Sequence, residues 1–103
     1  MVESGFQAQV IQELSLLFPG CFITKQVPPP QGIPDLLIEY GKTWARLETK
    51  KSLSEPYRPN QEYYIALFNE MSFAAMVCPE NKQEVYRQLK IHFTLFSGLF
   101  LEL

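Results

Sequence analysis

Three ionisable residues near the middle of the chain stand in a pattern that suits metal-assisted hydrolysis of a phosphodiester. Asp35 follows Pro34, and Glu48 precedes Lys50 by two positions. Such hydrolysis needs a cation that neutralises charge on the phosphate and lowers the pKa of the attacking water, and hard cations such as Mg²⁺ prefer carboxylate and carbonyl oxygens. Asp35 and Glu48 are therefore candidate metal ligands, and Lys50 can hold its ammonium against the water or the scissile phosphate.

A predicted hairpin brings the two carboxylates to one end of a sheet. Residues 33–40 form a strongly apolar strand candidate, and a Gly-Lys turn separates them from a second candidate at 43–49. In an antiparallel pair with this turn, the start of the first strand lies beside the end of the second. Asp35 and Glu48 stand at these two places, so we expect them to be neighbours.

The residues next to Glu48 extend this candidate site. Side chains alternate along a strand, so Lys50 shares a face with Glu48, and the backbone carbonyl of Thr49 can supply a third oxygen to a metal. A simpler interpretation is a solvated strand face whose exposed ion pair contributes less than about 1 kcal/mol. It accounts less well for Asp35, a carboxylate at the start of a strand that is apolar enough to be buried on both faces.

Helices and further strands must support the hairpin. Residues 3–18 predict an amphipathic helix, because apolar residues recur at spacings of three and four until Pro19 and Gly20 end the pattern. Asn81 can cap the last helix with its side chain. The other predicted elements are a strand at 21–27, a stiff connector at prolines 28–30, a helix at 61–69, a buried strand at 73–78 and a helix through Val85, Leu89 and His92.

The predicted order αβββαβα indicates an α/β domain with a mixed β-sheet flanked by helices. The helical connection after the hairpin returns the chain parallel to an earlier strand, which makes the sheet mixed. A length of 103 residues suits one compact domain, so we expect residues 1–103 to form a single unit. The 47% hydrophobic and 19% charged residues exclude a disordered chain.

The net charge of −2 argues against a protein that binds nucleic acid by bulk electrostatics. Contacts with a DNA backbone must therefore come from a local basic patch, for which the candidates are Lys25, Lys42, Lys51 and Arg58. Aromatic residues such as Trp44 pack in a protein core more often than they stack on nucleic-acid bases.

Other totals indicate the compartment. The chain contains no apolar run near the roughly 20 residues that span a bilayer, and its first residues lack the pattern of a secretion signal. We therefore expect an intracellular, cytoplasmic protein that does not enter a membrane. In that compartment Cys21 and Cys78 are predicted to be buried free thiols. His92, without a second histidine or a neighbouring carboxylate in the sequence, is predicted to be structural.

At the motif residues the sequence resembles the PD-(D/E)XK nuclease superfamily. Pro34-Asp35 matches the first half of the motif, and Glu48-Thr49-Lys50 matches the second. The similarity is greatest to compact members, notably the VRR-NUC nucleases and Holliday-junction-resolving enzymes of phages and archaea. These members share a restriction-endonuclease-like core, which the resemblance implies for this chain as well.

The resemblance extends beyond the motif to two helices. Compact members carry an acidic residue on a first helix and a glutamine on the helix after the strand pair. Glu3 and Gln7 both match the first position, because they are four residues apart on one helical face. If Gln7 occupies that position, the site has one negative charge fewer. Gln61 matches the second position, so the resemblance covers about residues 3–87.

The resemblance implies roles for these residues. Asp35 and Glu48 would bind one or two Mg²⁺ or Mn²⁺ ions, and Lys50 would assist the nucleophile. Glu3 would complete or support the metal site, and Gln61 would orient a phosphate, a water or Lys50. No organic cofactor is implied.

The implied activity is endonucleolytic hydrolysis of DNA, with branched or junction DNA as the substrate because the stand-alone relatives resemble junction resolvases. The apolar end, residues 93–103, is expected to pack in the core or to form the interface of a homodimer, which would place two sites on two DNA strands. The alternative is a non-catalytic DNA-binding or protein-interaction module that keeps the nuclease fold, which the acidic charge and short length favour.

Overall fold

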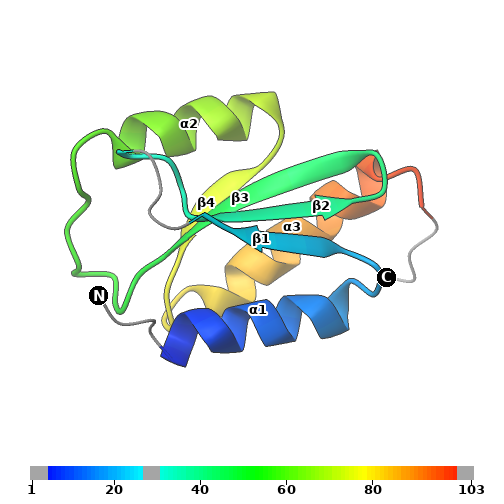
Figure 1. The fold of residues 1–103 in the computed structure, drawn as a ribbon, viewed down its shortest axis with the longest axis horizontal. Helices are drawn as coiled ribbons and strands as arrows, with labels where there is room; N and C mark the ends of the chain where they lie inside the picture. Colours follow the sequence, from blue (N-terminus) through cyan, green and yellow to red (C-terminus); the bar gives the residue numbers. More distant parts are fainter. Residues whose placement is uncertain (1–4, 27–30, 100–103) are drawn as a thin grey trace.

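The computed structural model describes residues 5–26 and 31–99 (Figure 1). The helices and strands follow the predicted order αβββαβα. In chain order they are α1 (Gly5–Leu17), β1 (Phe22–Lys25), β2 (Leu36–Tyr40), β3 (Thr43–Thr49), α2 (Gln61–Met71), β4 (Ala74–Val77) and α3 (Lys82–Phe96).

The four strands form one mixed sheet in the order β1-β2-β3-β4. β1 and β2 are antiparallel, β2 and β3 are antiparallel, and β4 lies parallel to β3 after the crossover through α2. Figure 1 shows α2 on one face of the sheet and α1 and α3 on the other. Among the described residues, no helix is both long enough and apolar enough to cross a membrane.

The β2–β3 hairpin is formed as predicted. Tyr40 pairs with Thr43, which leaves Gly41 and Lys42 as a two-residue connection. Gly41 has a φ of 59°, the left-handed value that a tight hairpin turn requires at its first position. The turn also packs against the end of α3, because the backbone N–H of Lys42 donates to the carbonyl of Ser97 at 2.7 Å.

The hydrophobic core lies between the sheet and the pair α1 and α3. Alternate residues of β2 and β3 point into it, and the apolar face of each helix covers them. Phe18, Tyr40 and Phe93 pack ring against ring, with centroids 4.9 to 5.6 Å apart. The fully buried residues of the hydrophobic core include Val10, Leu14, Phe18, Leu36, Ile38, Ala45, Leu47, Val77, Leu89 and Phe93.

Some predicted boundaries differ from the structure. β2 begins at Leu36 rather than at residue 33, because Gly32 has a φ of 87° and Pro34 has no N–H to donate to a sheet. β1 is shorter than the predicted strand at 21–27, and α2 continues to Met71. The prediction of a stiff connector at residues 28–30 lies outside the described residues.

Asn81 stands at the N-cap position of α3, as predicted. Its side chain makes no capping bond to the helix. It accepts a hydrogen bond from the backbone N–H of Cys78 at 2.8 Å and donates to the carbonyl of Met76 at 3.0 Å. The side chain therefore holds the turn after β4, where two nearby backbone groups compete for it.

The described part of the apolar end divides between core and surface. Phe93 and Ser97 are buried, whereas Leu95 is 67% exposed, Phe96 59% and Leu99 46%. α3 turns one face to the sheet and leaves a second apolar face uncovered. Among residues 93–99, the apolar side chain for which the expected core packing is confirmed is that of Phe93.

The structure agrees with the structural interpretation of the cysteines and the histidine. Cys78 is buried and Cys21 partly buried, and both are free thiols. Nε2 of His92 lies 3.0 Å from Oγ1 of Thr43 and 3.1 Å from Oγ of Ser72. These contacts join α3 to the start of β3 and the end of α2, and burial lowers the pKa of His92.

Candidate active site

Asp35 and Glu48 lie opposite each other at one end of the hairpin. Leu36 pairs with Leu47, and one step further along this antiparallel register Asp35 faces Glu48. On the other side, the backbone N–H of Gln26 donates to the carbonyl of Asp35 at 3.0 Å. Asp35, directly before the start of β2, is thus held between β1 and the end of β3, where Glu48 stands.

The Asp35 carboxylate is held in one orientation by neighbours. Nε2 of Gln7, on α1, donates to its Oδ2 at 2.5 Å and also to Oγ1 of Thr49 at 3.2 Å. Burial raises the pKa of Asp35, while hydrogen bonds from Gln7 and from the backbone of Thr49 act in the opposite direction. Oδ1 of Asp35 is buried and has no hydrogen-bond partner among the described residues.

Glu48 is destabilised as an anion. Burial and, after it, the negative charge of Asp35 raise the pKa of Glu48 to about 7, against the lowering effects of Lys50 and Arg58. Two half-buried carboxylates at facing positions of neighbouring strands repel each other when both are ionised. A cation between them would remove that cost.

This donor set fits a hard divalent cation. Asp35 offers a buried oxygen that nothing described satisfies, and Glu48 offers a second carboxylate whose ionisation a cation would favour. Within residues 5–26 and 31–99, no three His, Cys, Asp or Glu side chains gather into a metal-binding group. Water and a backbone carbonyl such as that of Thr49 would have to complete the coordination. Glu3, expected to support the metal, lies outside the described residues.

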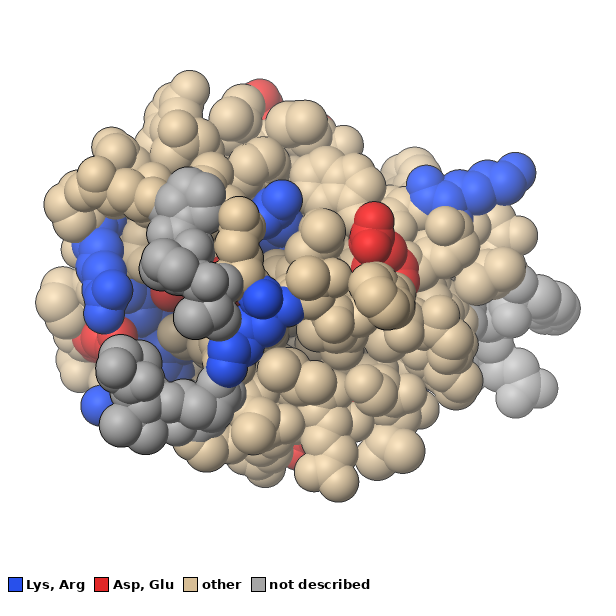
Figure 2. Space-filling model, viewed as in Figure 1, with Lys and Arg blue, Asp and Glu red and all other residues tan. Residues whose placement is uncertain are grey.

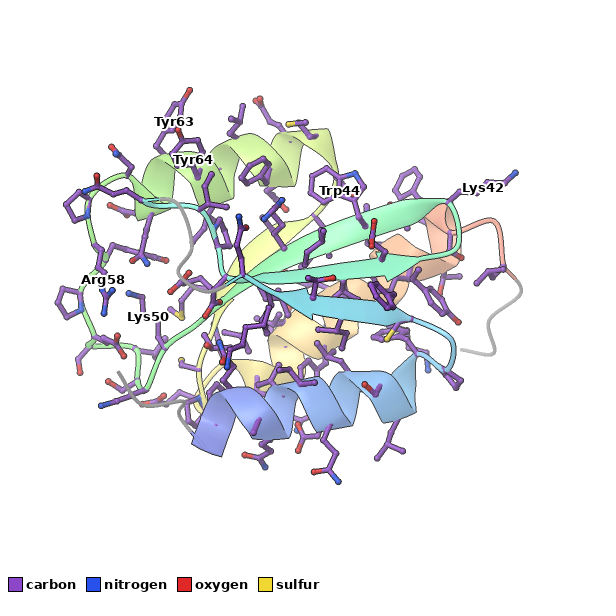
Figure 3. All side chains as sticks on the ribbon, in the orientation of Figure 1. Lys42, Trp44, Lys50, Arg58, Tyr63 and Tyr64 are labelled. Atoms are coloured by element: carbon purple, nitrogen blue, oxygen red, sulfur yellow. The ribbon has the colours of Figure 1, made fainter. Side chains whose placement is uncertain are left out.

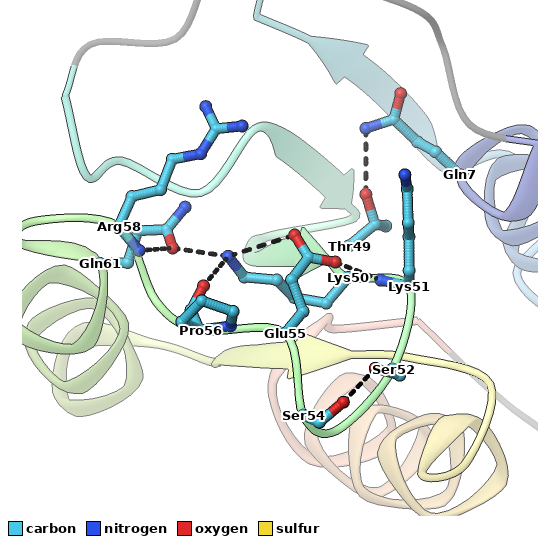
Figure 4. A network of polar contacts seen from close by, with 10 residues as sticks. All are labelled: Gln7, Thr49, Lys50, Lys51, Ser52, Ser54, Glu55, Pro56, Arg58 and Gln61. Carbon is cyan, nitrogen blue, oxygen red and sulfur yellow. Dashed lines mark hydrogen bonds and ion pairs between the residues drawn. The ribbon is translucent and has the colours of Figure 1, made fainter.

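Lys50 is buried beside this pair, with 4% of its surface exposed. Its ammonium donates to Oε1 of Gln61 at 2.8 Å and to the carbonyl of Pro56 at 3.1 Å, and lies 3.8 Å from Oε2 of Glu55 (Figure 4). The ring of Tyr57 lies 5.6 Å from the ammonium. In this structure Lys50 therefore joins the end of β3 to the loop that leads to α2.

Gln61 connects three parts of this network. Its Oε1 accepts from Lys50 and also from the backbone N–H of Arg58 at 2.7 Å. Asn60, which precedes it, has a left-handed φ of 70° and packs directly against Gly32, where a Cβ would come within 2.6 Å of the Cβ of Asn60. The start of α2 is thus placed by close backbone contact with the segment that leads to Asp35.

The comparisons with known proteins agree with this architecture. No protein-family model matches the sequence, and no curated protein matches it. Among solved structures, a VRR_NUC domain protein superposes with a TM-score of 0.60 over 98% of this chain and 93% of its own, at 21% sequence identity. The chain has the VRR-NUC fold. The predicted restriction-endonuclease-like α/β core is confirmed at the level of the fold.

Within the VRR-NUC fold, Gln7 is the first-helix residue that reaches the site. It stands on the buried face of α1 and bonds to Asp35 directly. The sequence left Gln7 and Glu3 as alternatives, and the structure describes only Gln7. A neutral amide of α1 therefore bonds to Asp35.

Three of the four predicted DNA contacts lie at the site end of the VRR-NUC fold. The charge of Lys25 acts on Asp35, that of Arg58 acts on Glu48, and Lys51 follows directly after Lys50. Figure 2 shows most visible Lys and Arg side chains gathered over this half of the face. Lys42 is not brought together with them.

Lys42 lies apart from the other three candidates. It stands in the hairpin turn, at the opposite end of β3 from the candidate site (Figure 3). Six residues of extended strand from Lys42 to Glu48 correspond to roughly 20 Å. A role of Lys42 in DNA binding stays a prediction.

Arg46 was missed as a candidate. It lies two residues before Glu48 on the same face of β3, and this spacing is visible in the sequence. It lines a hollow of about 310 Å³ next to the carboxylates, together with Thr24, Lys25, Gln26, Asp35 and Leu37. Only the pairing of β1 with β2 shows that Lys25 and Arg46 flank Asp35 from two sides.

Proposed function

We propose that this protein hydrolyses phosphodiester bonds in DNA with the help of Mg²⁺ or Mn²⁺. The observation that carries this proposal is the opposition of Asp35 and Glu48 across β2 and β3, with one buried Asp35 oxygen left without a partner among the described residues. The fold supports it, because the solved structure that this chain resembles is described as a VRR_NUC domain protein.

Asp35 and Glu48 would hold the cation, and the carbonyl of Thr49 would add an oxygen. When bound, the metal supplies charge neutralisation at the phosphate and acidifies a water. Gln7 keeps Oδ2 of Asp35 occupied, so Oδ1 is the oxygen that would remain for the cation. The two carboxylates are then held as anions at neutral pH.

Lys50 would assist the reaction from the same face of β3 as Glu48. Its ammonium can donate to the attacking water or to a phosphate oxygen once it exchanges its contact with Pro56 or Glu55. Gln61 is the positioning residue for Lys50, because its amide oxygen holds the ammonium at 2.8 Å. Lys25, Lys51 and Arg58 would contact the DNA backbone.

A cleavage assay tests this proposal. Purified protein is incubated with four-way junction, flap, linear duplex and single-stranded DNA in Mg²⁺, Mn²⁺ or EDTA. We expect cutting only with metal, and a loss of about 100-fold or more in Asp35→Asn and in Lys50→Ala. Glu70→Gln, at the end of α2 away from Gln61, and Lys90→Gln, on α3, serve as matched controls. Full activity in both site variants would rule out this assignment.

One observation favours the alternative, a non-catalytic module. Lys50 is fully engaged by Gln61, Pro56 and Glu55, as expected for a purely structural lysine. A non-catalytic protein would bind DNA equally well in EDTA and in Mg²⁺ and would leave every substrate intact. The same assay therefore separates the two functions.

We further propose that residues 1–103 act as one nuclease domain inside the cell, on branched or junction DNA and as a homodimer. The free thiols Cys21 and Cys78 suit a reducing compartment. The exposed apolar face of α3, with Leu95 and Phe96, offers a surface for a second copy. A two-fold dimer would present two sites to two strands of a junction.

A further inference from the structure

One face of the sheet is only partly covered. α2 packs against β3 and β4, and within residues 5–26 and 31–99 no helix lies above the side chains of β1 and β2 on this face (Figure 1). The strand register arranges the side chains of this face in three rows across the sheet. From the hairpin turn toward the candidate site, the rows are Phe22, Glu39 and Trp44; then Thr24, Leu37 and Arg46; then Gln26, Asp35 and Glu48.

The middle row carries a cation next to the carboxylates. The guanidinium of Arg46 lies 5.0 Å from the ring centroid of Phe68 on α2, and its Nη1 donates weakly to the carbonyl of Pro34 at 3.5 Å. These contacts hold the guanidinium without a carboxylate partner among the described residues, and its five N–H groups leave donors for an anion. Lys25 pairs with Leu36, so its side chain leaves the other face of the sheet, and it borders the same hollow from the edge strand β1.

A second hollow lies beside the first. It has a volume of about 290 Å³ and is lined by Leu37, Glu39, Trp44, Arg46, Phe68 and Met71. It shares Leu37 and Arg46 with the hollow of about 310 Å³ beside Asp35. The two hollows are therefore neighbours along the hairpin, the first bordered by β1 and the second by α2, and together they are called the track.

The chemistry changes along this track. The carboxylates stand at one end, the cations Lys25 and Arg46 come next, and aromatic side chains lie at the far end. Phe22 is 67% exposed there, and Trp44 is partly exposed against Phe68 (Figure 3). Phosphates prefer guanidinium and ammonium groups, and unpaired bases prefer exposed rings. Glu39 in the aromatic row disfavours a phosphate at that end.

The dimensions suit one strand rather than a duplex. The distance from β1 to β3 covers two strand spacings, or about 10 Å, which is half the width of a double helix. Successive rows are about 7 Å apart, comparable to the length of one nucleotide in an extended strand. A single strand can therefore place one phosphate at the carboxylates and the next at Arg46.

We propose that this track, defined by Lys25, Leu37, Trp44, Arg46 and Phe68, binds an unpaired DNA strand that leads to the scissile phosphate. Lys25 and Arg46 contact the phosphate next to the one that is cut, and the following base lies on the aromatic row. This assignment rests on the proposed function for the position of the cut, and it makes DNA with a single-stranded arm the substrate class.

Binding without cleavage tests the track. Fluorescence anisotropy in EDTA measures the affinity of the protein for a labelled short oligothymidylate and for a blunt duplex. We expect Arg46→Gln and Lys25→Gln each to weaken binding of the single strand roughly tenfold and to reduce its salt dependence by about 0.7 in the log–log slope. Arg46→Lys should keep most of the affinity, and Lys90→Gln on α3 should match the wild type.

Two further variants examine the far end of the track. Trp44→Leu should weaken single-strand binding about tenfold by removing a stacking surface, with duplex binding within twofold of the wild type. Glu39→Gln should strengthen single-strand binding about twofold. Lys25 is exposed, so its variant remains informative if substitutions at Arg46 or Trp44 disturb folding.

The outcomes distinguish this inference from the proposed function. Wild-type affinity for the single strand in Lys25→Gln and Arg46→Gln, or an equal loss for single strand and duplex, would overturn the track. If the protein cuts DNA while these variants bind normally, only the track is wrong. If the variants lose single-strand binding but no DNA is cut in metal, the track stands and the proposed hydrolysis fails.

Discussion

At the scale of single residues, the candidate site depends on opposed requirements at Asp35 and Glu48. Burial makes both anions costly, and each makes the other more costly still. The neighbouring groups offset this only in part: Gln7 donates to Asp35, and Lys50 and Arg58 act on Glu48 through their charges. The metal-free protein therefore carries strain that a bound cation would relieve.

We expect this strain to appear as a pH dependence of stability. The pKa of Glu48 is about 7 in the folded protein, above its ordinary value of 4.5. A carboxyl with a raised folded-state pKa stabilises the fold fully below about pH 4.5, and this contribution disappears as the pH rises through 7. In EDTA, ionisation of Glu48 should lower the free energy of unfolding by about 2 kcal/mol between pH 5 and pH 8. This value is reduced for the partial exposure of the carboxyl.

Urea denaturation of the wild type and of Glu48→Gln across this pH range measures that contribution. The variant lacks the titrating group, so the difference in free energy of unfolding between the two proteins should grow with pH. Mg²⁺ should restore the wild type at pH 8 and have little effect on the variant. A difference that stays constant from pH 5 to pH 8 would contradict the raised pKa.

At the scale of elements, the joint between the segment before β2 and the start of α2 positions the catalytic candidates. Gly32 lies against Asn60, and the next residue, Gln61, holds Lys50. Gly32 has a φ of 87°, so glycine serves both the backbone conformation and the close approach. One contact of backbone with backbone thus links the carboxylate end of β2 to the lysine of β3.

We expect Gly32→Ala to damage both stability and activity. Its Cβ would meet Asn60 at 2.6 Å, whereas a Cβ at Gly20, which also has a positive φ, would meet nothing within 4 Å. Gly20→Ala therefore controls for backbone strain alone. Gly32→Ala should be less stable than this control by about 1–3 kcal/mol and should cut DNA more slowly, because Gln61 shifts. Equal unfolding midpoints in urea for the two variants would refute the role of the contact.

At the scale of the whole molecule, the two faces of the sheet have different tasks. α1 and α3 enclose the core on one face, and the partly open face carries the site and the proposed track. The net charge of −2 is compatible with this division, because most Lys and Arg side chains visible in Figure 2 gather at one end of that face. The exposed apolar residues of α3 belong neither to the core nor to the track. They are therefore available for contact with a second copy of this chain.

Leu95→Asp tests the proposed homodimer. Leu95 is 67% exposed on α3, so an aspartate there should leave the fold intact and disrupt an apolar interface. Light scattering after size-exclusion chromatography should give a dimer for the wild type and a monomer for this variant. Leu16→Asp, at a 75% exposed leucine of α1, is the matched control and should remain dimeric. A monomeric wild type would refute the dimer.

Local patterns in the sequence determined the order of elements and the hairpin. Alternation along β2 and β3 and the two-residue turn at Gly41 and Lys42 set the register, and the register places Asp35 opposite Glu48. These features depend on neighbours in the chain, so the sequence shows them directly. The motif residues are therefore the part of the candidate site that the sequence predicts best.

Only the tertiary structure decided which residues surround that pair. Gln7 reaches Asp35 from 28 residues away, and Gln61 holds Lys50 from 11 residues away. Lys42 is directed to the far end of the sheet, while Arg46 joins Lys25 beside the carboxylates. These relations arise from how α1 and α2 pack on the sheet and how β1 pairs with β2, and such long-range packing depends on the whole core rather than on any local run of residues.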